Sequence, residues 1–268
     1  MNRNDVLIEA DELLKKFDDK NIRIFDATIT DDVYLQRHIP GAAYFDHDRF
    51  SDLNSPYSCT IPPETRLAEQ IGKAGISNDS EVVVYACGML PYAIRAWWVL
   101  RYAGHNNVRV LNGGISAWEK AGGQTEQEAR HYEPSSFKPR FNAAMFASKE
   151  EVLSSMEDDD VAIVNVLPLE SYESSHIVGS TCLSCMDLME GLEYLLPDEK
   201  LAARLNEMSK HKRIITYCGG GIAATVNAAA HLITGHNNVA VYDGSMYEWV
   251  AEGLPLKGTG KWELWFQK

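Results

Sequence analysis

The chain has no hydrophobic run that approaches the roughly 20 residues needed to span a bilayer. Its first sixteen residues are polar and amphipathic and lack the apolar core of a secretory signal. Basic residues are also few, 25 against 38 acidic ones, which gives a formal net charge of −13. Because nucleic acids and anionic membranes bind basic surfaces, neither is expected as the main partner. These absences predict a cytoplasmic protein whose partner is a small molecule or another protein.

Cysteine is scarce as well. The five cysteines, an odd number, fit a reducing compartment better than a disulfide framework. Cys182 and Cys185 have C-x-x-C spacing, but no second cysteine pair or histidine cluster completes a tetrahedral zinc site. We interpret the two as packing residues, with a sulfur relay or redox switch as the alternative. Neither a metal nor a cofactor is expected.

The sequence contains a duplicated unit. The segment GHNNV at 104–108 recurs at 235–239, and the related segments HIPGA and HIVGS lie at 38–42 and 176–180. Motif order is the same in both halves, and the spacing of more than 130 residues far exceeds the 20–50 residues typical of stacked repeats. Each half is therefore predicted to be a whole domain.

A polar stretch separates the halves. Residues 124–140 include Pro134 and Pro139 and have neither helical nor strand periodicity, which is typical of a linker. The predicted organisation is a first domain over residues 1–123, a linker over 124–140 and a second domain over 141–268.

Apolar, β-branched runs alternate with helical patterns in both halves. This order predicts an α/β fold with a mostly parallel sheet covered by helices on both faces. In such sheets ligands bind at the carboxyl ends of the strands. The predicted strands are Ile22–Phe25, Val82–Tyr85, Val108–Leu111, Val161–Val166, Arg213–Tyr217 and Val239–Tyr242.

Cys218 lies where the strand ending at Tyr217 gives way to three glycines and an alanine-rich segment, Ala223–Ala230. This order predicts a strand, a tight loop and the start of a helix. The helix N-terminus and the unobstructed N–H groups of the loop would stabilise the thiolate of Cys218. Cys218 is therefore a candidate nucleophile; the alternative is a buried structural cysteine.

Two other interpretations of this segment are disfavoured. Gly219-x-Gly221-x-x-Ala224 with Asp243 24 residues after Gly219 is similar to a dinucleotide fingerprint, but only one further strand follows it. A cysteine phosphatase needs an arginine six positions after its nucleophile, and that position is Ala224.

A set of ordered motifs runs through both halves: Asp26-Ala27, Arg37–Ala42, Phe45-Asp46, Ser55–Tyr57, Arg95–Trp98, Leu111–Gly114 and Tyr242–Trp249. With them the chain resembles the tandem-domain rhodanese-like sulfurtransferases, the family of thiosulfate and 3-mercaptopyruvate sulfurtransferases. The resemblance covers nearly the whole chain. It implies two tandem rhodanese-like domains, each a mostly parallel sheet flanked by helices.

The resemblance also implies which residues act. The first domain would be catalytically silent, with Ala86 at the matching point and Cys87 as a packing residue. In the second domain Cys218 would open the active loop, which continues through Gly219, Gly220, Gly221, Ile222 and Ala223.

The implied reaction is sulfur transfer in two steps. Cys218 takes a sulfur atom from a small donor, 3-mercaptopyruvate or thiosulfate, and holds it as a persulfide. An acceptor thiol, such as thioredoxin or a low-molecular-weight thiol, or cyanide then removes it. Asp26 and His38 would assist proton transfer together with a serine of the family, at whose position this chain has Gly220.

Other departures from the family bear on the donor. The neutral residues after Cys218 favour the mercaptopyruvate branch over the thiosulfate branch. The arginines that grip the donor's carboxylate or sulfonate align with Leu167 and Ser171, and Arg95 or Lys212 could supply charge instead. The alternative function is a rhodanese-like binding or regulatory module without efficient catalysis.

Overall fold

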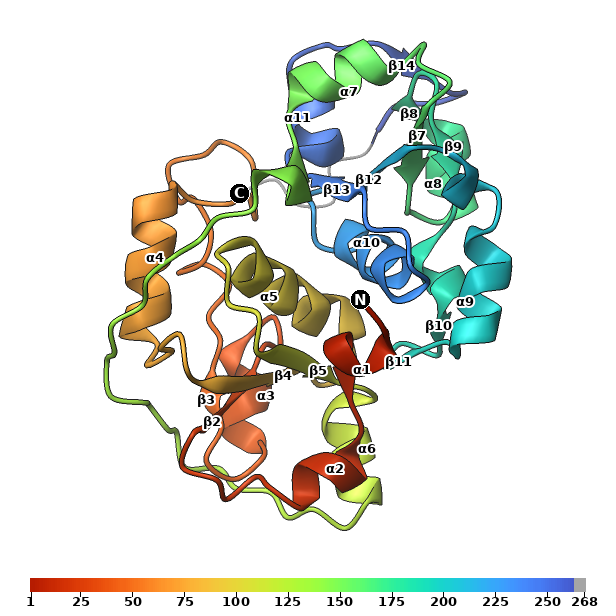
Figure 1. Cartoon of the computed structure of the whole chain (residues 1–268). Helices are drawn as coiled ribbons and strands as arrows, with labels where there is room; N and C mark the ends of the chain where they lie inside the picture. The colour runs from red at the N-terminus through yellow and green to blue at the C-terminus, as the bar shows by residue number, and fades with distance from the viewer. Residues whose placement is uncertain (263–268) are drawn as a thin grey trace. The chain divides into compact units, whose positions relative to one another are not determined.

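The computed structural model describes residues 1–262, which form two compact units (Figure 1). The first unit consists of residues 1–52, 61–143 and 189–196, and the second of residues 53–60, 144–188 and the chain from 197 onward. Each unit thus includes one short segment from the other half of the sequence. The sequence boundaries at 123 and 141 stay a prediction.

The first unit contains a five-stranded parallel sheet in the order β1-β5-β4-β2-β3. Its strands are β1 (Leu7–Ile8), β2 (Ile22–Asp26), β3 (Ala43–Tyr44), β4 (Glu81–Tyr85) and β5 (Val108–Leu111), with a separate antiparallel pair, β10 (Met189–Glu190) and β11 (Tyr194–Leu195). Its helices are α1 (Arg3–Val6), α2 (Ala10–Leu14), α3 (Asp31–Gln36), α4 (Glu64–Lys73), α5 (Leu90–Tyr102) and α6 (Gly114–Lys120).

The second unit repeats this sheet in the order β6-β13-β12-β7-β9. Its strands are β6 (Phe146–Ala147), β7 (Val161–Asn165), β9 (Thr181–Cys182), β12 (Arg213–Tyr217) and β13 (Val239–Tyr242), with a separate antiparallel pair, β8 (His176–Ile177) and β14 (Leu256–Lys257). Its α-helices are α7 (Lys149–Ser155), α8 (Leu169–Ser174), α9 (Asp198–Leu205), α10 (Ala224–Ile233) and α11 (Ser245–Ala251). Two 3-10 turns, Cys185–Leu188 and Met208–Lys210, belong to the same unit, and a third spans Ala143–Met145.

The expected α/β class is confirmed, and all six predicted strands lie within one residue of their observed bounds. Within the second unit α10 covers one face of the sheet, and α7 and α11 cover the other (Figure 1). Four tryptophans are fully buried in the cores of the two units, namely Trp97, Trp98, Trp118 and Trp249. No helix among residues 1–262 is long and apolar enough to cross a membrane.

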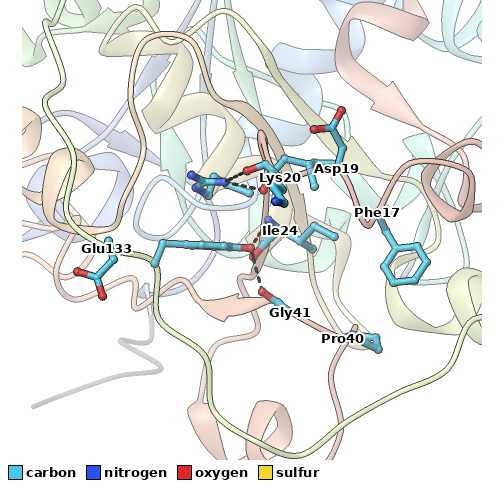
Figure 2. Close-up of a pocket in the computed structure, with 10 residues that line it drawn as sticks. Phe17, Asp19, Lys20, Ile24, Pro40, Gly41 and Glu133 are labelled. Carbon is cyan, nitrogen blue, oxygen red and sulfur yellow. Dashed lines mark hydrogen bonds between the residues drawn. The ribbon is translucent and has the colours of Figure 1, made fainter.

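Residues 124–140 contain no helix or named strand and run along the first unit. Tyr132 attaches this stretch to the sheet, since its hydroxyl accepts the Ile24 N–H at 2.9 Å and donates to the Gly41 carbonyl at 2.9 Å (Figure 2). The Arg23 guanidinium lies 4.9 Å from the centroid of the Tyr132 ring. The same residues line a pocket of about 390 Å³, so the linker forms part of the wall of this pocket.

Each unit contains a buried histidine that is held neutral. Burial lowers the pKa of His47 to about 4 and that of His231 to about 3, and the neighbouring His236 lowers the pKa of His231 further. The ordinary pKa of histidine is about 6.5. Between pH 6.5 and these lowered pKa values, each of the two histidines binds a proton in the unfolded chain but not in the folded protein. The stabilisation from the neutral histidines is therefore fully present above pH 6.5 and is lost progressively as the pH falls.

We expect His231→Leu to make the protein less sensitive to acid. The loss of unfolding free energy between pH 7.5 and pH 5 should be about 2 kcal/mol smaller than in the wild type, because the buried titrating group is gone. Urea unfolding curves at the two pH values measure this difference. His131→Leu, at an exposed position, is the control, and an equal loss in all three proteins would contradict the prediction.

Candidate active site

Cys218 follows the last residue of β12, at the carboxyl edge of the second unit's sheet. Tyr217 pairs in register with Asn165 of β7, and the Val166 N–H donates to the Tyr217 carbonyl at 3.0 Å. Cys218 is 3 % exposed. The predicted strand, loop and helix start are thus confirmed around this cysteine, which lies where parallel sheets bind ligands.

The loop from Cys218 to Ala223 leaves several backbone N–H groups unpaired. Gly221 has φ +80°, a left-handed conformation that favours glycine. Helix α10 then begins without a side-chain cap at Ala223. Among residues 1–262, no acceptor binds the N–H groups of Gly219, Gly220, Ile222 or Ala223. Unpaired N–H groups at a helix N-terminus form a binding site for an anion, so this loop can hold a charged sulfur atom.

The matching loop of the first unit has its N–H groups occupied. Those of Cys87, Gly88 and Leu90 donate to the Thr28 hydroxyl at 2.9 Å, the Glu193 carboxylate at 3.0 Å and the Leu192 carbonyl at 2.9 Å. Glu193 also accepts a hydrogen bond from the Ser116 hydroxyl at 2.9 Å. An internal carboxylate therefore accepts the N–H of Gly88, and Ala86 stands at the position that matches Cys218.

Ser245 holds the backbone of Cys218, a contact that sequence reasoning missed. Its hydroxyl accepts the Cys218 N–H at 3.1 Å and donates to the Tyr242 carbonyl at 2.8 Å. Ser245 is fully buried and has φ +49°, which is strained for a residue with a side chain. The first unit has Gly114 at this point, where an added Cβ would lie 2.1 Å from the Ala86 carbonyl oxygen. One feature of the sequence pointed to this contact: the second half of the chain has Ser245 where the first half has Gly114.

The two cysteines of the C-x-x-C segment are poor nucleophiles. Burial raises the pKa of Cys182, and its thiol donates to the Leu167 carbonyl at 3.6 Å. Burial and the proximity of Cys218 raise the pKa of Cys185 to about 12. Both are therefore neutral thiols near pH 7. This agrees with packing as their role.

Asp26 and His38, predicted to act with Cys218, lie in the first unit. Asp26 is buried, which raises its pKa, and its carboxylate accepts the Thr28 N–H at 2.9 Å. His38 is fully buried, with Nδ1 2.7 Å from the Tyr34 carbonyl oxygen and Nε2 3.1 Å from the Glu128 carbonyl oxygen.

Their counterparts in the second unit make similar contacts. Asn165 accepts the Leu167 N–H at 2.9 Å, and Nδ1 of His176 lies 2.6 Å from the Tyr172 carbonyl oxygen. The pairs thus fix equivalent loops in both units. A catalytic role for Asp26 and His38 stays a prediction.

Lys212, which we considered with Arg95 as an alternative source of charge for the donor, lies at the opposite end of β12 from Cys218. Lys212 directly precedes β12 and its ammonium pairs with Asp160 at 2.6 Å, whereas Cys218 directly follows β12. A strand of five residues separates the two by about 17 Å. Arg95 is buried in α5 of the first unit, and its contribution stays a prediction.

The chain is similar to known proteins over both of its halves. A family model described as a rhodanese-like domain matches residues 9–121 and 148–252. The chain is 34% identical over 238 residues to the thiosulfate sulfurtransferase of Bos taurus, covering 83% of this chain and 80% of that protein. It is 30% identical over 247 residues to the 3-mercaptopyruvate sulfurtransferase of Mus musculus, covering 85% and 83%. The crystal structure of a 3-mercaptopyruvate sulfotransferase from Escherichia coli is similar with a TM-score of 0.83 and 28% identity, covering 91% and 99%.

We expect Ser245→Ala to be less stable than Ser245→Gly. Both variants leave the Cys218 N–H without its acceptor, which costs about 1–3 kcal/mol. The alanine also keeps a strained positive φ, so it should be about 1 kcal/mol less stable than the glycine variant. Urea midpoints of the two variants measure the difference, and equal midpoints would show that the strain at Ser245 is absent.

Glu193→Ala should destabilise the first unit by about 1.5–3 kcal/mol, because the Gly88 N–H and the Ser116 hydroxyl lose a charged acceptor. Glu193→Gln, which keeps an acceptor oxygen, should lose less. Glu190→Ala, at an exposed position in the same segment, is the matched control. Thermal unfolding of the three variants tests the order, and a Glu193→Ala protein as stable as the control would contradict it.

Proposed function

This chain belongs to the rhodanese family of sulfurtransferases, and on that premise we propose that Cys218 carries a sulfane sulfur from a small donor to a thiol. Two tandem rhodanese-like domains account for its architecture. The proposal depends mainly on one observation: the N–H groups of Gly219, Gly220, Ile222 and Ala223 have no hydrogen-bond acceptor among residues 1–262, whereas those of Cys87, Gly88 and Leu90 in the first unit are occupied.

In the first step, the Cys218 thiolate attacks the outer sulfur of the donor. A sulfur–sulfur bond forms, and sulfite leaves from thiosulfate or pyruvate from 3-mercaptopyruvate. The unpaired N–H groups of Gly219, Gly220, Ile222 and Ala223 stabilise negative charge on the transferred sulfur. The loop and the first residue of α10 hold these N–H groups in position before the donor binds. No reorganisation of the protein is therefore needed when negative charge forms on the transferred sulfur.

In the second step, an acceptor thiol attacks the outer sulfur of the persulfide and regenerates Cys218. A low-molecular-weight thiol or a thioredoxin-like protein suits this step. Asp26 and His38 are proposed as assisting residues, through the loop contacts that each makes in the first unit.

The loop composition favours 3-mercaptopyruvate as the donor, since Gly219 and Gly220 add no positive charge for a small dianion. The donor's carboxylate would lack the contacts that arginines at Leu167 and Ser171 could have made. Each missing charge-assisted hydrogen bond weakens binding by about 1.5–3 kcal/mol, so a high KM is expected.

The alternative function is a rhodanese-like module that binds a partner without efficient catalysis. The residues Leu167 and Ser171 favour this alternative, because neither can bind an anion as arginine does. The retained cysteine, in a loop with unpaired N–H groups, favours the enzyme.

We expect the wild-type protein to gain one sulfur atom when incubated with 3-mercaptopyruvate or thiosulfate. Cys218→Ser should gain none and should lose transfer to a thiol, because no other cysteine stands in the active loop. Cys87→Ser should react as the wild type does. Mass spectrometry of the intact protein measures the gain, and a wild type that gains no sulfur from either donor would favour the binding module.

A further inference from the structure

Helix α11 is attached directly to the loop that begins at Cys218. The Met246 N–H donates to the Cys218 carbonyl at 3.1 Å, and the Tyr247 N–H donates to the Gly219 carbonyl at 3.0 Å. These bonds hold the first turn of α11 beside the loop. The side chain of Tyr247 is thereby placed next to the reacting cysteine.

The Tyr247 ring lies over Gly220. A Cβ added to Gly220 would lie 2.8 Å from both Cδ2 and Cε2 of the ring and 3.3 Å from the carbonyl oxygen of Ser58. Gly220 does not have a positive φ, so its backbone would accept another residue. The ring excludes a side chain at position 220. A side-chain hydroxyl above this part of the loop is therefore supplied by Tyr247 of α11.

The Tyr247 hydroxyl is available to a substrate. The residue is half-buried, and its hydroxyl makes no hydrogen bond within residues 1–262. Burial raises the pKa of Tyr247 above its usual value of 10, and negative charge on Cys218 and Cys59 raises it further. The phenol thus stays protonated across the physiological range and can act as a proton donor.

We propose that Tyr247 gives the proton to the carbon leaving group when the donor is 3-mercaptopyruvate. The inference rests on the proposed function of Cys218. The thiolate of Cys218 attacks the donor's sulfur, an S–S bond forms, and the electron pair of the broken C–S bond stays on carbon. The resulting enolate takes the proton of the phenol and becomes pyruvate. The phenoxide then recovers a proton from the more acidic persulfide, which remains as the anion in the loop.

Atoms and electrons balance without another reagent. The carbon is reduced from a thiomethyl to a methyl group, and the two sulfur atoms are oxidised to the persulfide level. Sulfur transfer from thiosulfate needs no proton donor, because the S–S bond of thiosulfate breaks to release sulfite, which leaves as a stable anion. The proton of Tyr247 is therefore needed for transfer from 3-mercaptopyruvate and not for transfer from thiosulfate.

The neighbouring thiol of Cys185 is less suited to this role. Cys185 is 7 % exposed and burial raises its pKa to about 12, so it is a weak acid in an enclosed place.

The test measures single-turnover sulfur loading of Cys218 by each donor. Tyr247→Phe keeps the ring over Gly220 and removes the proton. The ratio of mercaptopyruvate to thiosulfate loading rates should fall by about 10²–10⁴-fold, the usual contribution of a general acid. Tyr57→Phe, whose hydroxyl lies 3.5 Å from Glu252 in the same unit, is the matched control and should keep the wild-type ratio.

A second variant supplies the proton from a different residue. Tyr247→Val makes room above the loop, and Gly220→Ser combined with it places a hydroxyl there. In the double variant the ratio of mercaptopyruvate to thiosulfate loading rates should be at least about 10-fold higher than in Tyr247→Val alone. A gain of this size is in the range expected for one positioned proton donor. Thiosulfate loading in every variant shows that the loop is folded.

Each outcome decides between the two proposals. A wild type that loads sulfur from neither donor overturns the function of Cys218 and the role of Tyr247 with it. Loading from thiosulfate alone, or an unchanged ratio in Tyr247→Phe, overturns the role of Tyr247 while leaving that of Cys218 in place. A lowered ratio that the Gly220→Ser hydroxyl restores supports both.

Discussion

The site depends on the parallel register of β12 with its neighbours. Tyr217 pairs with Asn165 of β7, and the ladder with β13 ends at Thr216. Beyond these pairs no neighbouring strand accepts the next N–H groups, so the loop after Cys218 must satisfy them in another way. The N–H groups of Gly219, Gly220, Ile222 and Ala223 find no acceptor among residues 1–262 before α10 begins at Ala224. An anion bound at Cys218 would supply the missing acceptors.

The two units differ in what binds the N–H groups of the loop that follows the central strand. In the first unit the chain brings in the segment 189–196, and the Glu193 carboxylate binds the loop that follows β4. In the second unit four N–H groups of the corresponding loop have no acceptor among residues 1–262, and the Ser245 hydroxyl accepts the N–H of Cys218. One architecture thus yields a closed, structural loop and an open one, and the difference depends on a few side chains.

Two further features of the second unit leave the loop without polar or charged side chains of its own. Gly220 has no side chain because the Tyr247 ring occupies the space above it. The basic residues near β12 lie at its amino end, where Lys212 pairs with Asp160 and Arg213 with Glu151. Positive charge in this part of the unit therefore stabilises the sheet edge opposite Cys218. In the proposed transfer, charge on the sulfur is therefore stabilised by the backbone N–H groups.

The sequence by itself determined the α/β class, the duplication, the six central strands and the place of Cys218, because hydrophobic periodicity and glycine placement are local signals. Only the tertiary structure decided that Glu193 fills the first loop, that Ser245 supports Cys218 and that the Tyr247 ring lies over Gly220. Between 27 and 105 residues of chain separate the members of these pairs. Their contacts follow from how strands and segments pack, which no local pattern encodes.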